Sequence, residues 1–243
     1  MKLLAVISLI VMGLFPLSSS ADIAFDASSE LDWASVGTTH TWGHTITGSD
    51  LVLVVESFTV SGAPPDTATY NGDPLTMQAQ QDSYTGDSNN VSMWTITNPD
   101  TGTHNIVVTF AGSNTTTHSA ASYTGVDTTD VPHKGATSGG GHASDSTDVV
   151  DTLVTTVDDS WLVSTVYGVD GPRETGSMVV RENSAAVNAG IHDLTTGTAG
   201  SHSMTWNNGG SAFRFGAHIT IALAPVADIV ASDPPKINTV IID

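Results

Sequence analysis

Four aspartates form the group of side chains that comes closest to a metal site. Asp127, Asp130, Asp145 and Asp148 lie on either side of the glycine run 139–141, in a segment that we expect to be a loop. Carboxylates are hard oxygen ligands that suit calcium, but aspartate also caps turns, and the spacing is not that of an EF-hand. The segment is not a phosphate loop, because no Gly-Lys-Ser/Thr follows the glycines. Calcium is therefore the one cofactor that the sequence predicts, with turn capping as the alternative.

Two further acids have a spacing that could serve catalysis. Glu30 and Asp32 would share one face of a strand, because side chains alternate, and retaining glycosidases use such a pair of carboxylates. Sandwich enzymes of that kind carry a third acid two or three residues further on, whereas residues 34–36 here are Ala, Ser and Val. We therefore interpret residues 30–33 as a solvated loop that leads into the first core strand.

Histidine is more abundant than lysine and arginine together, at nine residues against six. His40, His104 and His202 each stand near the start of an expected strand, and a zinc site would have to gather them. Strand starts in antiparallel sheets fall at opposite ends, so the alternative is a set of rim histidines bonded to the backbone. We favour that alternative.

The five tryptophans raise the question of sugar stacking. Trp42, Trp94, Trp161 and Trp206 occupy strand positions typical of a core, and only Trp33 falls in an expected loop. The pattern therefore indicates no aromatic sugar platform. The sequence also lacks a nucleophile elbow, a Ser-His-Asp signature and a triple-acid motif. We expect no catalytic residues and no enzymatic activity.

Composition favours strands as the elements that position these residues. The chain has 243 residues, with 25 acids against 6 lysines and arginines and a formal net charge of −19. Glu and Lys, which form helices, are scarce, while the abundant Thr, Gly and Asp suit strands and turns. The charge repels nucleic-acid phosphates, so we expect no nucleic-acid partner. Because cysteine is absent, stability has to come from a buried core.

The segment 38–58 shows the expected architecture most clearly. Its first half alternates small polar residues with His40, Trp42, His44 and Ile46. This period of two indicates a strand with one apolar face and one polar, solvent-exposed face. After the turn at 48–50, residues 51–55 are apolar on both faces, as in a strand buried between layers. The pair predicts an all-β fold, a single antiparallel β-sandwich of jelly-roll type.

Other segments repeat this pattern. Asn71-Gly72 between two strand-like runs is a strong hairpin signal, because both turn positions need a positive φ. Residues 213–223 alternate cleanly and predict a half-buried final strand. We expect a buried core that includes Trp42, Leu53, Val55, Trp94, Val108, Phe110, Trp206 and Ile219.

The N-terminus is typical of an export signal. Lys2 precedes the apolar run 3–17, and Ser19-Ser20-Ala21 forms a small-residue cleavage site before Asp22. The alternative is a retained membrane anchor, which the short run and Pro16 disfavour. We expect a signal peptide at 1–21, a β-sandwich domain at 22–225, and a linker with a strand-like tail at 226–243.

Several motifs carry a resemblance that spans residues 22 to 225. They are HTWGHT, LVLVV, YNGDPLT, MWTITNPDTGTHNIVVTF, ASYTGVDTTD and the closing AHITIALAP. Together they resemble jelly-roll and concanavalin-like β-sandwich modules of bacterial surface proteins and of phage structural or tail proteins. The resemblance implies secretion or virion display. Its motifs are strand and turn signatures, so they imply a fold and no catalytic residues.

Two function classes remain open from the sequence. The first is a non-catalytic structural or adhesive protein, extracellular or on a virion surface, that self-associates into a larger assembly or docks glycans. The second is a concanavalin-like carbohydrate-active enzyme or lectin. We expect a secreted or surface-displayed protein, on a cell or a virion, without membrane contact after removal of the leader.

The C-terminal segment 237–242 holds four Ile and Val residues after the stiff Pro234-Pro235 linker. These residues favour a strand. We expect the segment to add to a sheet edge, either its own or that of a neighbouring subunit. A passive tail is the alternative.

Overall fold

The protein is built from antiparallel strands joined by turns. The computed structural model describes residues 22–60, 62–83, 89–135, 137–142, 148–168, 173–174, 177–184, 189–207 and 216–227, without the side chains of 33–35, 141, 142, 148, 173, 174 and 207. A short 3-10 turn, η1 (His133–Gly135), is the one helical element within this part of the chain. No helix in the described residues is long and apolar enough to cross a membrane. The expected all-β antiparallel class is thus confirmed.

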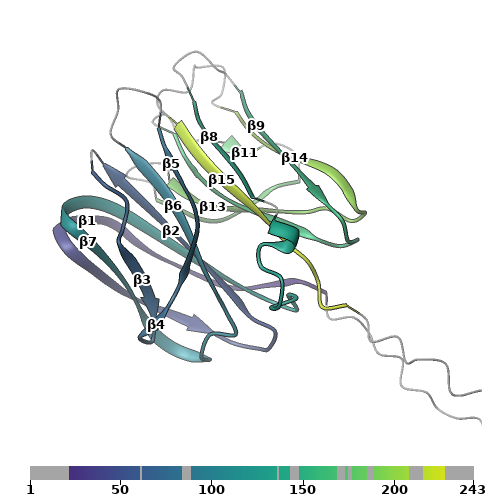
Figure 1. Ribbon diagram of the computed structural model, residues 1–243, viewed down its shortest axis with the longest axis horizontal. Coiled ribbons are helices and arrows are strands. Elements are labelled where there is room, and N and C mark those ends of the chain that lie inside the picture. Colours follow the sequence, from purple (N-terminus) through teal and green to yellow (C-terminus); the bar gives the residue numbers. More distant parts are fainter. Residues whose placement is uncertain are drawn as a thin grey trace, which may run out of the picture.

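Two long strands, β1 (Ala24–Ile46) and β7 (Gly102–Thr124), form a bent ribbon (Figure 1). Residues 24–31 pair with 118–124, and residues 39–46 pair with 102–109. Register shifts interrupt the ladder between residues 31 and 39, and such irregularities bend strands. The bend brings the side chains of Ser29 and His44, both on β1, within 2.8 Å of each other. The two ends of the ribbon therefore lie in different layers.

The first sheet has seven strands distributed over these two layers. In the main layer, β2 (Val52–Val60) pairs with residues 115–123 of β7 and with β6 (Asn90–Thr97), which pairs with β5 (Thr76–Asp82). In the outer layer, β3 (Thr67–Tyr70) pairs with residues 106–109 of β7 and with β4 (Asp73–Pro74). We use the name outer layer for β3, β4, residues 39–46 and residues 102–110. The sheet folds over itself and is nearly closed, like a barrel.

Two smaller sheets continue the stack. The second sheet has the order β12 (Val179–Ser184), β13 (Ala189–Thr195), β10 (Trp161–Tyr167), β15 (Gly216–Leu223) and β8 (Thr137–His142). The third has the order β11 (Arg173–Glu174), β14 (Gly200–Asn207) and β9 (Asp148–Thr155). Figure 1 shows the strands of these sheets on the side of the main layer away from β3 and β4.

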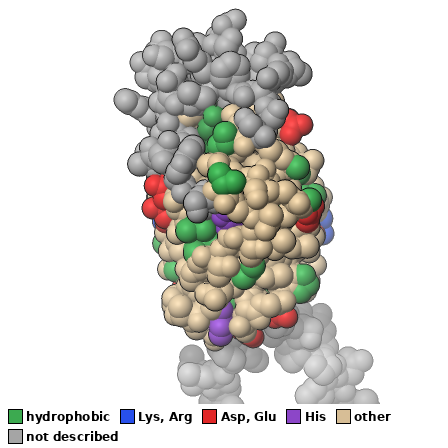
Figure 2. Space-filling model, turned by 90° about the vertical axis from the view of Figure 1, so that its left-hand side faces the viewer, with side chains coloured by type: hydrophobic (Ala, Val, Ile, Leu, Met, Phe, Trp, Pro, Cys, Tyr) green, Lys and Arg blue, Asp and Glu red, His purple; other side chains and the backbone are tan. Residues whose placement is uncertain are grey.

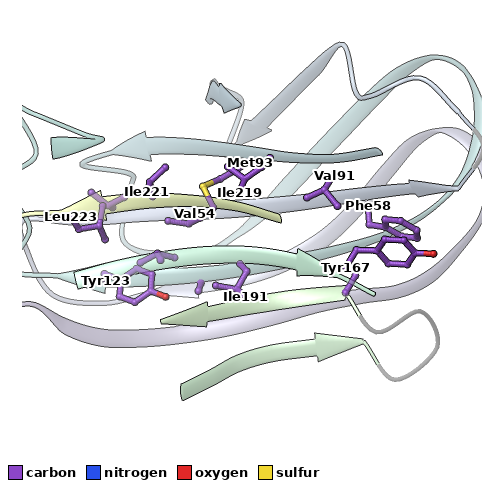
Figure 3. Packing of buried hydrophobic residues seen from close by; sticks show 14 of the residues in the cluster. Val54, Phe58, Val91, Met93, Tyr123, Tyr167, Ile191, Ile219, Ile221 and Leu223 are labelled. Atoms are coloured by element: carbon purple, nitrogen blue, oxygen red, sulfur yellow. The ribbon is translucent and has the colours of Figure 1, made fainter. Parts of the chain in front are cut away.

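Alternating side chains of the strands fill three cores between four layers. On β2, Val54 and Phe58 face the second sheet, while Leu53 and Val55 face the outer layer. Figure 3 shows the first of these cores, where Val54, Phe58, Val91 and Met93 meet Tyr167, Ile191, Ile219, Ile221 and Leu223. A third core lies between the second and third sheets around Trp206. Burying one large apolar side chain contributes about 1.5–3 kcal/mol, so each layer is held by its facing neighbour.

The core and the hairpin follow the sequence closely. All eight residues expected in the core are at most 7% exposed. Asn71 and Gly72 adopt φ values of 51° and 91°, as the hairpin turn requires.

Three local expectations were wrong. Residues 30–33, expected to be a loop, continue β1. Within 126–148, also expected to be a loop, the glycine run forms β8, which pairs with β15. The last strand, expected to be half-buried, is buried at every position of β15, because its sheet packs between two others. The jelly-roll assignment stays a prediction, and the leader and the tail beyond residue 227 lie outside the described residues.

Candidate functional site

Asp127 and Asp130 each stabilise the turn in which they lie. Asp127 Oδ1 accepts hydrogen bonds from the backbone N–H of Thr129 (3.1 Å) and from its hydroxyl (2.6 Å). Asp130 Oδ2 accepts one from the backbone N–H of Lys134 (3.1 Å), and the ring of His133 lies 3.0 Å away. The Lys134 backbone bond is the main contribution that holds the pKa of Asp130 below its usual value. Both carboxylates therefore do the capping that the sequence left open as the alternative.

The remaining part of the calcium prediction cannot be placed. Asp145 and the side chain of Asp148 lie outside the described residues. Among the residues that the structure describes, no three His, Asp or Glu side chains gather in a way that could hold a metal ion. Calcium binding at Asp127, Asp130, Asp145 and Asp148 stays a prediction of the sequence.

The acid pair on β1 lies beside two polar residues of β12 that the sequence did not indicate. Ser184 of β12 donates a hydrogen bond to Asp32. Partial burial raises the pKa of Glu30, and the nearby charges of Glu182 and Asp32 raise it further. A carboxyl with a raised pKa beside a hydrogen-bonded carboxylate is an arrangement that general acids use. The spacing along the chain could not reveal it, because β12, which packs against β1 without pairing with it, supplies Ser184 and Glu182.

The three histidines that were considered for zinc are bonded to the backbone. Nε2 of His40 lies 3.2 Å from the Gly37 carbonyl oxygen. The corresponding distances are 3.1 Å from His104 to Thr101 and 2.7 Å from His202 to Thr198. Each ring closes a local turn three or four residues back along the chain, which confirms the backbone-bonded interpretation.

A buried hydrogen-bond chain crosses the bent ribbon and centres on His44. Ser122 donates to Asp26 (2.7 Å) and lies 3.2 Å from His44 Nε2, so the imidazole donates to Ser122 from that nitrogen. Nδ1 then accepts from Ser29 (2.8 Å), whose oxygen accepts from Trp42 Nε1–H (3.1 Å). Burial lowers the pKa of His44 to about 4, which keeps the ring neutral.

A second Ser, Asp and His group lies between the second and third sheets. Ser138 on β8 donates to Asp151 on β9 (2.6 Å), and His218 Nε2 on β15 lies 3.2 Å from the same carboxylate. Burial opposes the ionisation of Asp151, but the bonds from His218 and Ser138 hold its pKa below the usual value.

In a catalytic triad the serine donates to the histidine and the histidine donates to the acid. In the first group Ser29 donates to His44, but His44 donates to Ser122 and not to Asp26. In the second group Ser138 donates to the acid. The two groups are built to join layers.

The outer layer presents a regular uncharged surface, which we call the threonine face. Its outward residues form the cross-strand rows Thr39, Thr109 and Thr67; Thr41, Val107 and Thr69; and Thr45 and Thr103. Rows of this kind repeat at about 4.8 Å between strands and about 7 Å along each strand. The hydroxyls of Thr45 and Thr103 lie 2.7 Å apart and are exposed.

A shallow hollow of about 450 Å³ opens on the threonine face. Its lining consists of Thr69, Asn71, Gly72, Thr103, His104, Asn105 and Val107. Figure 2 looks onto the side of the molecule where β1 and β7 lie in Figure 1. Backbone and side chains that are neither hydrophobic, charged nor histidine cover most of the described part of this view, and acidic side chains lie near its margins. Hydroxyls and side-chain amides donate and accept hydrogen bonds without charge. The hollow therefore suits a neutral, hydroxyl-rich ligand.

A second hollow, of about 340 Å³, has a different character. Its lining includes Asp22, Asp159 and Trp161. The Arg181 guanidinium, which pairs with the buried Asp193, lies 5.7 Å from the centre of the Trp161 ring. This hollow therefore contains two carboxylates and an aromatic ring that already lies beside a cation. It is less suited to a neutral sugar than the threonine face is. Comparisons with protein-family models, with curated proteins and with solved structures gave no match.

Proposed function

We propose that this chain is a non-catalytic surface protein, secreted or carried on a virion, that docks neutral glycans through the threonine face. The observation that carries the proposal is the contrast in charge. A chain with a net charge of −19 presents one broad strand surface with no charged outward side chain among its rows. Such a surface can approach a neutral polysaccharide without having to desolvate a charge.

The hollow gives this surface a local recognition site. Asn105 supplies an amide group, and Thr69 and Thr103 supply hydroxyls, from two paired strands. Asn71, in the adjoining turn, supplies an amide oxygen, while its nitrogen donates to the Asp100 carboxylate beside the hollow (2.8 Å). Aromatic stacking contributes little, because the lining holds no aromatic ring besides the imidazole of His104. We therefore expect weak binding at each site and useful affinity only when several copies engage one polymer. A β-sandwich of jelly-roll type, as expected from the sequence, is a suitable rigid support.

The first test is a glycan array probed with the mature chain in multivalent form. We expect signals from neutral oligosaccharides and none from sulfated or uronic-acid ligands. The double variant Thr69→Val/Thr103→Val keeps side-chain shape but removes two hydroxyls, and it should weaken binding at least about tenfold, equivalent to 1.4 kcal/mol.

The matched control is Thr76→Val, which removes an exposed hydroxyl from β5, away from the hollow. It should bind as the unchanged protein does, and all variants should keep the same melting temperature. An array without neutral-glycan signals, or full binding by the double variant, contradicts the proposal.

The second candidate function is a carbohydrate-active enzyme that uses Glu30 as its general acid. The observation in its favour is the raised pKa of Glu30, caused by partial burial and then by Glu182 and Asp32. Glu30→Gln should abolish hydrolysis across a polysaccharide panel. Glu182→Gln should shift the alkaline limb of the pH profile to lower pH, because a general acid must stay protonated. Asp66→Asn, an exposed acid elsewhere, is the control. If no polysaccharide is hydrolysed, this candidate is rejected and the first is unaffected.

A further inference from the structure

The edge strands of the three sheets differ in how they are protected. An edge strand exposes unpaired backbone groups, and proteins guard such edges with bulges, charged side chains or proline. Within the described part of the chain, β1 and β5 carry register shifts. β12 carries a shift and the charged residues Arg181 and Glu182. β8 is rich in glycine, which disfavours pairing.

β9 has no register shift and no proline, and its described outward side chains are uncharged. Its eight residues pair with β14 without a register shift, and no described strand pairs with its other side. The described outward side chains are Val150, Thr152 and Val154, and the two valines are 55% and 61% exposed. Asp151 points inward to His218. Exposed valines on a regular, uncharged edge are a surface prepared for pairing.

We propose that β9 pairs with β9 of a second copy, antiparallel, about a two-fold axis through Thr152. The arrangement follows from the spacing of the valines. Val150 and Val154 are equidistant from Thr152 along the strand, so the axis places each Val150 opposite the partner copy's equivalent of Val154. A two-fold contact of this kind is self-complementary and closes after two copies. The third sheet then continues across the dimer.

Charge supports a second copy as the occupant of this edge. Two chains of net charge −19 repel each other, so a contact between them needs a region poor in acids. The described outward side chains of β9, which are Val150, Thr152 and Val154, are uncharged. The neighbouring outward residues Ser201, Ser203 and Thr205 on β14 are also uncharged and add no local repulsion. One pair of strands buries a small area, so the dimer should be weak. Salt should strengthen it, because a higher ionic strength screens the repulsion between the two copies.

The test is sedimentation velocity of the mature chain over a concentration series, from roughly 0.01 M to roughly 1 M salt. We expect a monomer at low salt and a growing dimer fraction at high salt. Thr152→Lys places two like charges against each other on the axis and should weaken association at least about tenfold. Val179→Lys adds the same charge at an exposed valine of β12 and should leave association unchanged.

A charge-exchange pair tests the register itself. Val150→Lys/Val154→Glu places opposite charges across each cross-copy pair and should retain the dimer, whereas Val150→Lys/Val154→Lys should abolish it. These positions are exposed, so melting temperatures of the monomers should stay equal. A monomer at every salt concentration, or equal behaviour of the two double variants, overturns the proposal. Glycan binding by monomeric variants should persist, because the threonine face lies on another sheet.

Discussion

At the scale of single residues, the cores hold several ionisable groups that the fold keeps neutral. Neither carboxylate oxygen of Glu56 has a hydrogen-bond partner among the described residues. Burial raises the pKa of Glu56 to about 8, and the nearby Ser119 hydroxyl opposes this rise only in part. Burial likewise lowers the pKa of His118 to about 3 and that of His192 to about 4.

Glu56→Gln should remove a pH-dependent loss of stability. The folded state raises the pKa of Glu56 from 4.5 to about 8, so folding holds a proton that the unfolded chain releases. The free energy of unfolding therefore falls by about 1.4 kcal/mol for each pH unit between these values. In denaturant titrations, the difference in the free energy of unfolding between pH 5 and pH 8 should be smaller for the variant than for the unchanged protein. Parallel stability curves for the two proteins would falsify the assignment.

Trp206→Ala should destabilise the protein by about 3–5 kcal/mol. The indole is fully buried and packs against the rings of His192 and His218, with centroids 6.2 and 5.8 Å away. The measurement is the denaturation midpoint, with Val154→Ala as an exposed control that should change stability by less than about 0.5 kcal/mol. An unchanged midpoint for the tryptophan variant contradicts the core placement.

The sequence predicted the backbone bonds of the surface histidines but did not predict the buried ionisable groups. His104 and His202 bond to nearby carbonyls, as their positions near strand starts predicted. Glu56 lies on a strand whose neighbours are apolar on both faces, yet a carboxyl is rarely buried without a partner. Its burial follows from a second sheet that packs on that face, and the sequence pattern of one strand contains no information on what covers it.

At the scale of elements, the alternation of polar and apolar residues predicted where strands lie. It did not predict that two such segments join into one long strand. The first half of the segment 38–58 was expected as a separate strand, whereas residues 39–46 are one half of the long strand β1. Polar residues at the bend resemble a loop, because the bend exposes them. β8 was missed for another reason: glycine has low strand propensity, and only the close approach of β15 shows why glycine is required there.

Gly139→Ala should destabilise the edge of the second sheet. A Cβ at this position would lie 2.8 Å from the backbone oxygen of His218, so β8 and β15 would have to move apart. We expect a loss of about 1–3 kcal/mol, as for overpacking. Gly112→Ala is the control, because its Cβ would meet no atom within 4 Å. Thermal melts of the two variants separate the outcomes, and equal melting temperatures would contradict the close approach.

At the scale of the whole molecule, titration should set an optimum of stability near neutral pH. His44, His118 and His192 have pKa values lowered by burial from 6.5 to about 4, 3 and 4. Unfolding then takes up protons below pH 6.5, so stability falls as the pH decreases from 6.5 toward 4. Glu56 makes stability fall on the alkaline side, up to about pH 8.

Denaturant titrations at pH 5, 6.5 and 8 should therefore give the highest midpoint at pH 6.5. His192→Phe removes one titrating group, and its acid-side slope should decrease by about 1.4 kcal/mol for each pH unit. Glu56→Gln should leave the acid side falling and flatten the alkaline side. A midpoint that rises steadily from pH 5 to pH 8 contradicts this balance.

The pairing of β1 with β7 also determines the order in which the chain can fold. Ala24 pairs with Thr124, and Phe25 with Tyr123, so the start of β1 has no partner until about a hundred further residues have been synthesised. Contacts over such a separation carry a large loop-closure entropy and slow the search for the native state. During that interval the start of β1 stays unpaired. The main layer can therefore be completed only after the last residues of β7 have been made.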